Sequence, residues 1–236
     1  MAIKCITFDL DDTLWDCASV IARAEETFYA WLHRHYPRVA RRYEPDSLLE
    51  HRQAYYARYP ELHHDLTALR KQWLRHLARE AGCGPDLVET GFAVFWRHRN
   101  AVQMFDDAHA ALQTLSARYR IGAITNGNAD VHHIGVGHYF DFVVTAAGAG
   151  AAKPHPDIFR AALDEAGVAA HEAAHVGDDP RSDVMGAAAV GMRTIWVNPN
   201  GRAWPGETEP DAVVRSVGEV LTVLDAWAER PHPRRG

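Results

Sequence analysis

The alternation of strand-like and helix-like stretches over residues 101–197 constrains the fold of this chain most. A β-prone run at residues 2–10 adds a further strand. Strands separated by helices of this length form a parallel sheet with right-handed crossovers and helices on both faces. The sequence therefore predicts an α/β protein with a doubly wound parallel sheet. Beyond the first run, the expected strands are 120–125, 142–145, 175–177 and 194–197, and the expected helices 108–119, 156–166 and 183–190.

Residues 17–98 lack this alternation and are typical of helices alone. Apolar side chains recur there at helical spacing, as in Ile21, Ala24 and Phe28. We expect one all-α insertion after the first strand, and an α/β core made of residues 1–16 and 99–236. The expected helix boundaries are Pro37, Asp46 or Ser47, Asp65 with Gly82 at the C′ position, and Pro85.

Polar side chains gather where the predicted strands end, which is where parallel sheets bind their ligands. Asp9 and Asp11 follow the first strand, and side chains two apart on a strand point the same way. Carboxylates this close repel one another, so the cluster calls for a cation. The remaining strand-end groups are Thr125, Asn126, Lys153, Asp178 and Asp179, with Asp183 beyond them.

Four of these segments, in this order, resemble the motifs of the haloacid dehalogenase superfamily of hydrolases. The resemblance covers the whole chain and implies a Rossmann-like core with a C1-type helical cap formed by the insertion. The matching segments are Asp9-Leu-Asp11-Asp12-Thr13, Thr125-Asn126-Gly127, Lys153-Pro154 and Gly177-Asp178-Asp179-Pro-Arg-Ser-Asp183.

The resemblance implies a Mg²⁺-dependent phosphatase. Asp9 would attack phosphorus and form an aspartyl-phosphate, which splits one difficult hydrolysis into two easier steps. Asp11 would protonate the leaving oxygen and then deprotonate the attacking water. The implied ligands of the metal are the carboxylates of Asp9 and Asp178 and the backbone carbonyl of Asp11.

Phosphate binding is implied for the second and third motifs. Thr125 and the backbone N–H of Asn126 would hold phosphate oxygens, and Lys153 would place a positive charge among them. Asp183 would orient Lys153 or a metal-bound water. Asp179 suits the same task, so the division between these two carboxylates stays open.

Asp11 also separates the activities within the superfamily. Its dehalogenase members resemble the phosphatases but lack this second aspartate, because a halide leaves without a proton. The presence of Asp11 favours phosphoryl chemistry over carbon–halogen cleavage. A phosphomutase would use the same four motifs, and a non-enzymatic binding or scaffolding protein would not need Asp9.

Several local stretches resemble bacterial flavin-pathway phosphatases, which act on FMN and on 5-amino-6-(5-phospho-D-ribitylamino)uracil. They include His64-Asp65-Leu-Thr67 in the insertion and Ile124-Thr-Asn-Gly-Asn-Ala129. The resemblance implies a role in riboflavin biosynthesis, with His64 and Arg70 contacting the substrate. The alternatives are another small metabolite, such as a sugar phosphate, phosphoglycolate or a nucleotide.

The segment His171-Glu-Ala-Ala-His175 matches the H-E-x-x-H pattern of zinc metalloproteases. That pattern binds zinc only on a helix, where positions i and i+4 share a face. Gly167 ends the preceding helix and His175 begins a strand, so we expect the two histidines not to share a face.

Composition restricts the partners. The net charge of −6 argues against sequence-independent binding to nucleic acid. The three cysteines are odd in number and lack metal-ligand spacing, and no apolar run approaches the roughly 20 residues of a membrane helix. We therefore expect a cytoplasmic protein whose partner is a small phosphorylated metabolite; the sequence indicates no oligomeric state.

Overall fold

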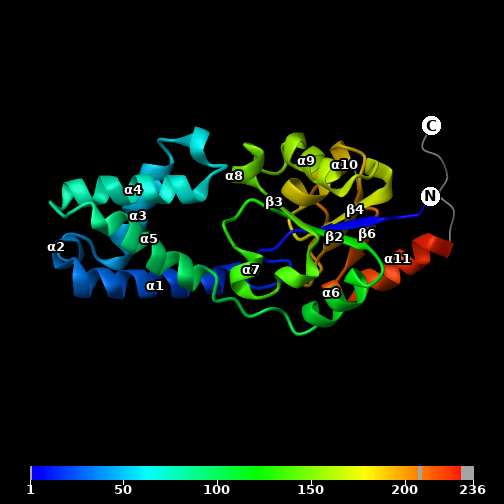
Figure 1. Ribbon diagram of the computed structural model, residues 1–236, viewed down its shortest axis with the longest axis horizontal. Coiled ribbons are helices and arrows are strands. Elements are labelled where there is room, and N and C mark those ends of the chain that lie inside the picture. The colour runs from blue at the N-terminus through cyan, green and yellow to red at the C-terminus, as the bar shows by residue number, and fades with distance from the viewer. Residues whose placement is uncertain (1, 207–208, 230–236) are drawn as a thin grey trace. The chain divides into compact units, whose positions relative to one another are not determined.

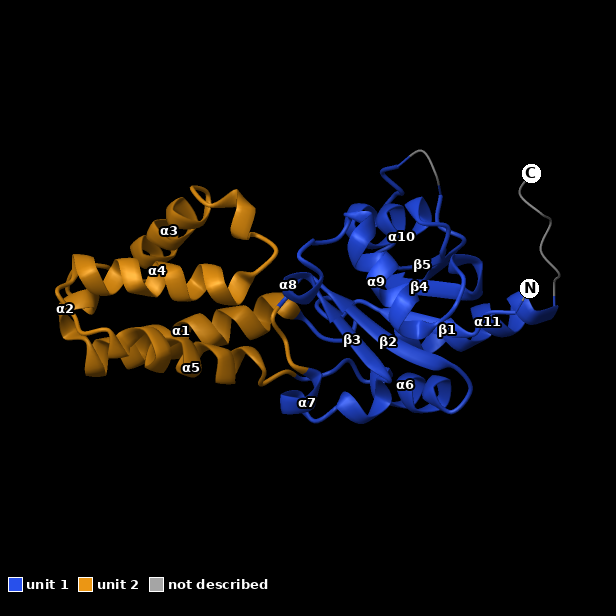
Figure 2. Ribbon diagram, turned by 45° about the horizontal axis from the view of Figure 1, so that its top comes forward, with its two compact units in different colours: residues 1–16, 103–127, 131–236 blue, residues 17–102, 128–130 orange. Residues whose placement is uncertain are grey.

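The computed structural model of the chain describes residues 2–206 and 209–229. The chain divides into two compact units (Figure 2). The sequence placed the boundary after residue 98, whereas the division falls after Val102 and also assigns a short later segment to the helical unit. The α/β unit comprises Met1–Asp16, Gln103–Gly127 and Val131–Gly236, and the helical unit comprises Cys17–Val102 and Asn128–Asp130.

A parallel sheet forms the centre of the α/β unit. The strand order is β3-β2-β1-β4-β5-β6, and every neighbouring pair is parallel. Because β1 lies between β2 and β4, the winding of the chain reverses at β1, and a ligand site is expected at the carboxyl end of that strand. The strands are β1 (Cys5–Phe8), β2 (Arg120–Thr125), β3 (Phe142–Thr145), β4 (Ala173–Gly177), β5 (Arg193–Val197) and β6 (Ala212–Val214).

Helices cover both faces of this sheet, as the alternation predicted. In Figure 1, α9 and α10 lie on one side and α6 and α11 on the other. Ile158 and Phe159 of α9 are buried in one cluster with Ile124 of β2 and Phe142 of β3. The helices and helical turns are α6 (Ala108–Ser116), α7 (Val131–Ile134), η2 (Gly137–Tyr139), α8 (Ala146–Ala149), α9 (Pro156–Ala166), η3 (Ala170–Glu172), η4 (Pro180–Met185), α10 (Gly186–Ala189), η5 (Val217–Glu219) and α11 (Val220–Glu229).

The helical unit contains the elements expected of the insertion. The Asp65 side chain accepts a hydrogen bond from the Ala68 N–H (2.8 Å) at the start of α4, and Gly82 follows that helix with φ +62°, both as predicted. The second predicted cap is wrong: α3 begins at Pro45, and Glu44 is its N-cap. The elements are α1 (Cys17–His35), α2 (Pro37–Ala40), α3 (Pro45–Tyr56), η1 (Pro60–Leu62), α4 (Leu66–Glu80) and α5 (Asp86–Arg99).

The short segment Asn128–Asp130 is tied to the helical unit by two hydrogen bonds. The Asn128 side-chain amide donates to the Thr67 hydroxyl (3.3 Å), and the Asp130 N–H donates to the Asn100 side-chain oxygen (2.7 Å). Thr67 and Asn128 belong to the two stretches that resemble the flavin-pathway phosphatases, so these stretches are in contact.

Across residues 2–206 and 209–229, the helices are each too short or too polar to span a bilayer.

Candidate active site

Three neighbouring strands bring the first, second and fourth motifs to one edge of the sheet. β1 pairs in parallel with β2 on one side and with β4 on the other. The pairing continues one residue past β1, because the Asp9 N–H donates to the Val176 carbonyl (2.9 Å). The backbone at Asp9 is therefore fixed by the sheet itself.

Lys153 links this edge to two carboxylates. Its ammonium group donates to Asp9 Oδ1 (2.5 Å), to Asp183 Oδ1 (2.7 Å) and to the Ile124 carbonyl (2.8 Å). An ammonium group has three N–H donors, so each one has an acceptor here. The side chain is only 2% exposed, which makes this a buried charge shared between two buried carboxylates.

Burial and neighbouring charges have opposing effects on the pKa values of Asp9, Asp183 and Lys153. Burial outweighs the opposing effect of Lys153 on Asp9, so the pKa of Asp9 is raised to about 8. Burial alone would raise the pKa of Asp183, but Lys153 and His175 hold it well below its usual value. Burial alone would lower the pKa of Lys153, but the two carboxylates hold it above its usual value. Lys153 therefore stays charged.

Asp178, which follows β4, has no comparable cation to compensate it. Burial, together with the nearby Asp183, Asp12 and Asp179 carboxylates, raises its pKa to about 7, and Arg202 offsets this only in part. Its backbone carbonyl accepts hydrogen bonds from the Trp196 indole N–H (2.8 Å) and from the Arg202 guanidinium (3.0 Å). Both donors, which come from β5 and the loop after it, were not predicted from the sequence.

The carboxylates fit a small divalent cation. Oxygens of Asp9, Asp178 and Asp183 lie within 4.8 Å of one another, and all three are hard ligands of the kind that Mg²⁺ prefers. The Thr13 hydroxyl lies 3.4 Å from Asp9 Oδ2 and 3.5 Å from Asp178 Oδ1, so these two carboxylates have oxygens on the same side. Burial is the main cause of the raised pKa values of Asp9 and Asp178, and a bound cation would stabilise the ionised forms of both carboxylates.

Asp179 and Asp183 occupy different positions, which bears on the alternative that the sequence left open. Asp179 caps the helical turn η4, where its Oδ1 accepts from the Arg181 N–H (3.0 Å) and the Ser182 N–H (2.6 Å). Asp183 bonds to Lys153 instead, and its Oδ2 accepts from the Asp179 N–H (3.0 Å). Of the two, Asp183 is the carboxylate that contacts Lys153.

His175 is within hydrogen-bonding distance of Asp183, a contact that no sequence pattern predicted. Its ring is buried between the Thr7 hydroxyl (2.8 Å from Nδ1) and Asp183 Oδ1 (3.3 Å from Nε2). Burial lowers its pKa, despite the opposing effect of Asp183. His171 lies in η3 and His175 in β4, so the two histidines do not share a helix face, as expected.

The loop after β2 is held to Lys153 through its backbone. The Asn126 side chain accepts from the Lys153 N–H (2.7 Å) and donates to the Lys153 carbonyl (3.0 Å). The buried Thr125 hydroxyl accepts from the Gly127 N–H (2.9 Å). The second and third motifs thus form one hydrogen-bonded structure, in which the Asn126 side chain orients the loop.

The residues after Asp9 form a tight turn. Asp12 has φ +61°, and its N–H donates to the Trp15 carbonyl (2.8 Å). The Trp15 indole N–H donates to Asp11 Oδ1 (2.8 Å), and Trp15 is fully buried. Asp11 is half-buried. Asp11 was predicted as a site residue, whereas Trp15, which bonds to it, was not.

The two residues of the helical unit that were expected to contact the substrate are placed differently. His64 is half-buried between η1 and α4. Arg70 is 3% exposed and lies inside the helical unit, where its guanidinium donates to Glu25 Oε1 (2.7 Å) and Oε2 (3.0 Å). The same group stacks over the Phe95 ring, 3.3 Å from the centroid.

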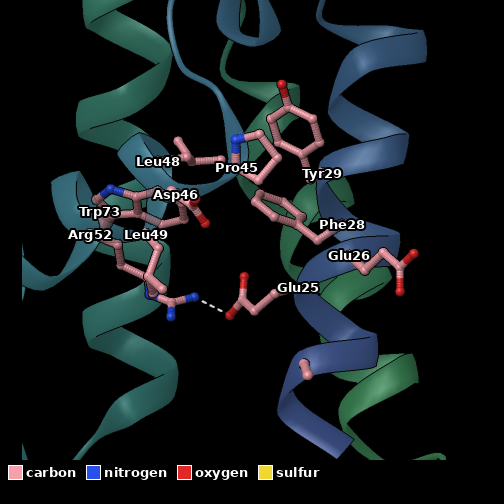
Figure 3. A pocket seen from close by; sticks show the side chains of 11 residues that line it. Glu25, Glu26, Phe28, Tyr29, Pro45, Asp46, Leu48, Leu49, Arg52 and Trp73 are labelled. Atoms are coloured by element: carbon pink, nitrogen blue, oxygen red, sulfur yellow. Dashed lines mark hydrogen bonds and ion pairs between the residues drawn. The ribbon is translucent and has the colours of Figure 1, made fainter. Parts of the chain in front are cut away.

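A cavity of about 280 Å³ lies in the helical unit, between α1, α3 and α4 (Figure 3). Aromatic and aliphatic side chains form most of its wall, among them Phe28, Leu48 and Trp73. The ion pair between Arg52 and Glu25 lies at one end of it.

A second cluster of metal-ligand type, His51, His76 and Glu80, is explained by hydrogen bonds. His51 Nδ1 accepts from the Trp73 indole N–H (3.1 Å), so neutral His51 carries its proton on Nε2. That nitrogen lies 3.0 Å from Glu80 Oε2 and donates to it. A metal on Nε2 would move the proton to Nδ1, against the indole N–H, and the donor set therefore does not fit a metal.

Comparisons with known proteins agree on the class of the chain. Residues 3–191 match a family described as haloacid dehalogenase-like hydrolase. One relative is the 5-amino-6-(5-phospho-D-ribitylamino)uracil phosphatase YigB of Escherichia coli, 31% identical over 94% of this chain and 96% of that protein. Another is a phosphoserine phosphatase of Thermus thermophilus, 34% identical over 64% of each chain.

A solved structure is similar over almost the whole chain. It is described as a 2-haloacid dehalogenase from Pseudomonas syringae and is 40% identical, with a TM-score of 0.89 over 95% of this chain and 99% of that one. The two relatives are thus named as phosphatases, whereas the similar structure is described as a dehalogenase. The choice between these activities depends on the residues of the site.

Proposed function

The chain belongs to the haloacid dehalogenase-like hydrolases, and from this membership we propose that it is a Mg²⁺-dependent phosphatase acting on a small phosphate monoester. The proposal rests above all on one observation: Asp9, bonded to buried Lys153, is followed two residues later by a second carboxylate, Asp11, that an indole N–H holds in place. The names of two relatives, both phosphatases, support it.

In the first step, an Asp9 oxygen attacks phosphorus as the bond to the leaving oxygen breaks, and an aspartyl-phosphate results. Lys153 neutralises part of the charge that opposes this approach of an anion to an anion. Asp9 and Asp178, with the Asp11 carbonyl, would hold Mg²⁺, which when bound screens the phosphate charge. Asp183 keeps Lys153 in position through their 2.7 Å hydrogen bond.

Asp11 moves the protons. It gives one to the leaving oxygen and then takes one from the water that hydrolyses the aspartyl-phosphate, which restores its starting state. The Thr125 hydroxyl and the Asn126 backbone N–H bind phosphate oxygens, beside the Lys153 ammonium. The bonds between the Asn126 side chain and the Lys153 backbone keep these donors together.

Dehalogenation is the second candidate, favoured by the name of the 40% identical structure. In that reaction Asp9 would displace a halide from carbon, and no group would need to protonate the halide. Asp11 has no such task to perform there, which is why we place phosphatase activity first. Chloride release from 2-chloropropionate, measured beside phosphate release from a panel of metabolite phosphates, decides between the two.

The substrate that we propose is FMN or 5-amino-6-(5-phospho-D-ribitylamino)uracil. The support is the similarity to YigB over 94% of the chain and the contact between Thr67 and Asn128 in the two resembling stretches. His64 would contact the substrate. Arg70 would not touch the substrate itself and would instead position Glu25, to which it is bonded. We expect kcat/KM for FMN or the pathway intermediate to exceed that for glucose 6-phosphate at least tenfold. Equal values across both classes would contradict this assignment.

The function itself is tested with Asp9→Asn. Wild-type protein should release phosphate only with Mg²⁺, and Asp9→Asn should abolish release while circular dichroism shows an intact fold. Acid-quenched wild-type protein should carry a phosphate that hydroxylamine removes. The control is Asp225→Asn, the same change at a half-exposed position of α11, which should leave activity unaltered. Isomerised substrate without free phosphate would instead indicate a phosphomutase.

A further inference from the structure

Trp15 is fixed from two directions. On one side, the turn that contains Asp12 returns the chain to Asp11, with the Asp12 N–H bonded to the Trp15 carbonyl (2.8 Å). On the other, Trp15 forms an antiparallel bridge with Met104, and the Phe105 N–H donates to the Leu14 carbonyl (2.9 Å). With the side chain fully buried, the indole has little freedom to turn.

The Trp15 indole bonds to only one of the two carboxylate oxygens of Asp11. An indole N–H is a donor only and is not ionised near neutral pH. Its 2.8 Å bond occupies Asp11 Oδ1 as an acceptor. We therefore assign the transferred proton to the other oxygen, Oδ2, because the bond to Oδ1 can stay the same before and after the transfer. One oxygen serves as the anchor and the other as the site of proton transfer.

We propose that Trp15 is a positioning residue that presents Oδ2 of Asp11 to the leaving group, and that the site is thereby specialised for phosphate monoesters of alcohols. This inference rests on the phosphatase function proposed above. An alkoxide is a strong base that departs only with a proton, whereas p-nitrophenolate departs without one. Accurate placement of Oδ2 therefore matters for the first class of substrate and much less for the second.

The proton balance defines the step. As the Asp9 oxygen bonds to phosphorus and the ester P–O bond breaks, the proton on Asp11 Oδ2 passes to the ester oxygen, and a neutral alcohol leaves. Ionised Asp11 then removes a proton from water as the water oxygen bonds to phosphorus and the bond from Asp9 to phosphorus breaks. Inorganic phosphate is released, and Asp11 is neutral again.

Trp15→Phe tests the proposal because it removes the N–H and keeps an aromatic ring. General acid catalysis contributes about 10²- to 10⁴-fold in rate, so misplacing the acid should lower kcat/KM for an alkyl phosphate about tenfold to hundredfold. The value for p-nitrophenyl phosphate should stay within about threefold, since kcat/KM reports only the steps through departure of the leaving group. Trp227→Phe, a half-buried indole on α11, is the matched control and should alter neither.

A double-mutant cycle with Asp11→Ala tests whether Trp15 acts through Asp11. If it does, adding Trp15→Phe to Asp11→Ala should cause no further loss with the alkyl phosphate. Additive losses, or equal losses with both substrates in Trp15→Phe alone, would overturn the inference. If Trp15→Phe unfolds, benzothienylalanine at position 15 keeps the bicyclic ring and removes only the N–H, and the same comparison applies.

The failure of this inference is distinguishable from the failure of the proposed function. Wild-type protein that releases no phosphate from either substrate would refute the phosphatase assignment. Wild-type protein that is active, with a Trp15→Phe variant that loses both activities equally, would refute only the role of Trp15.

Discussion

Asp9, Asp11 and Asp12 lie within four residues of one another, yet the structure gives each a different environment. Asp9 is bonded to a buried ammonium, Asp11 to a buried indole, and Asp12 adopts φ +61° at the turn. The left-handed region costs most L-residues about 1–2 kcal/mol, but Asp and Asn enter it more readily because their side chains bond locally. Backbone shape is therefore the main demand on position 12.

Asp12→Asn should accordingly be the mildest substitution of the three, with activity within about threefold of wild type. Asp12→Val should lower the free energy of unfolding by about 1–2 kcal/mol, since a β-branched residue is poorly suited to this φ. Urea denaturation and phosphate release measure the two effects. Equal loss of activity in Asp9→Asn, Asp11→Asn and Asp12→Asn would contradict this division.

Residue type explains which parts of the site the sequence revealed. Asp9, Lys153 and Asp178 were visible because charged residues at strand ends are conspicuous. Trp15 and Trp196 were not, because by composition they are core residues, and they are indeed buried. Their second property, an N–H directed at Asp11 or at the Asp178 carbonyl, depends on side-chain direction, which no sequence pattern encodes.

At the scale of elements, the connection from β4 into η4 determines where Asp183 lies. Gly177 ends β4, and a Cβ added there would overlap the Asp183 carboxylate. The close approach of the turn to the strand is what brings Asp183 within reach of Lys153. Glycine at position 177 is therefore a requirement of the site and not of the strand.

Gly177→Ala should displace Asp183, lower kcat at least tenfold and reduce the melting temperature, because the buried Lys153 charge loses a partner. The control is Gly148→Ala in α8, an exposed glycine where the nearest atom to an added Cβ is the Thr145 hydroxyl oxygen at 3.2 Å. That variant should be neutral in stability. Wild-type kcat in Gly177→Ala would show that the position of Asp183 is not critical.

The elements themselves were predictable where their patterns are long. Helix 156–166 was predicted at its observed bounds as α9, and strands 120–125 and 142–145 as β2 and β3. β6 and α11 were not predicted. β6 is a three-residue strand, too short to display an alternating pattern, and its place in the sheet comes from pairing with β5.

For the whole molecule, Mg²⁺ should raise the melting temperature, and more so at pH 8.5 than at pH 6. The pKa values of Asp9 and Asp178 are raised to about 8 and about 7, so at pH 6 both carboxylates are neutral and the metal must displace protons. At pH 8.5 both are largely ionised, so the metal displaces few protons and relieves the cost of the buried charges in the metal-free protein. The rise in melting temperature caused by Mg²⁺ therefore increases with pH.

Differential scanning calorimetry with and without Mg²⁺ at the two pH values measures this. At a Mg²⁺ concentration about 100 times Kd, linkage gives about 2.7 kcal/mol of stabilisation. Asp178→Asn is the control, in which the response to Mg²⁺ should largely disappear at both pH values. An equal rise at pH 6 and pH 8.5 in the wild type would contradict the ionisation argument.

The segment Asn128–Asp130 has a consequence for exchanging modules between relatives. It follows Gly127 directly, yet its hydrogen bonds go to Thr67 and Asn100 of the helical unit. The helical unit is therefore not a simple insertion with one entry and one exit. The backbone passes between the two units at four points. A chimera in which a foreign insertion replaces residues 17–102 should also receive the donor's counterpart of residues 128–130. Without that segment, the foreign helical unit would lack the hydrogen bonds that Asn128 and Asp130 make here.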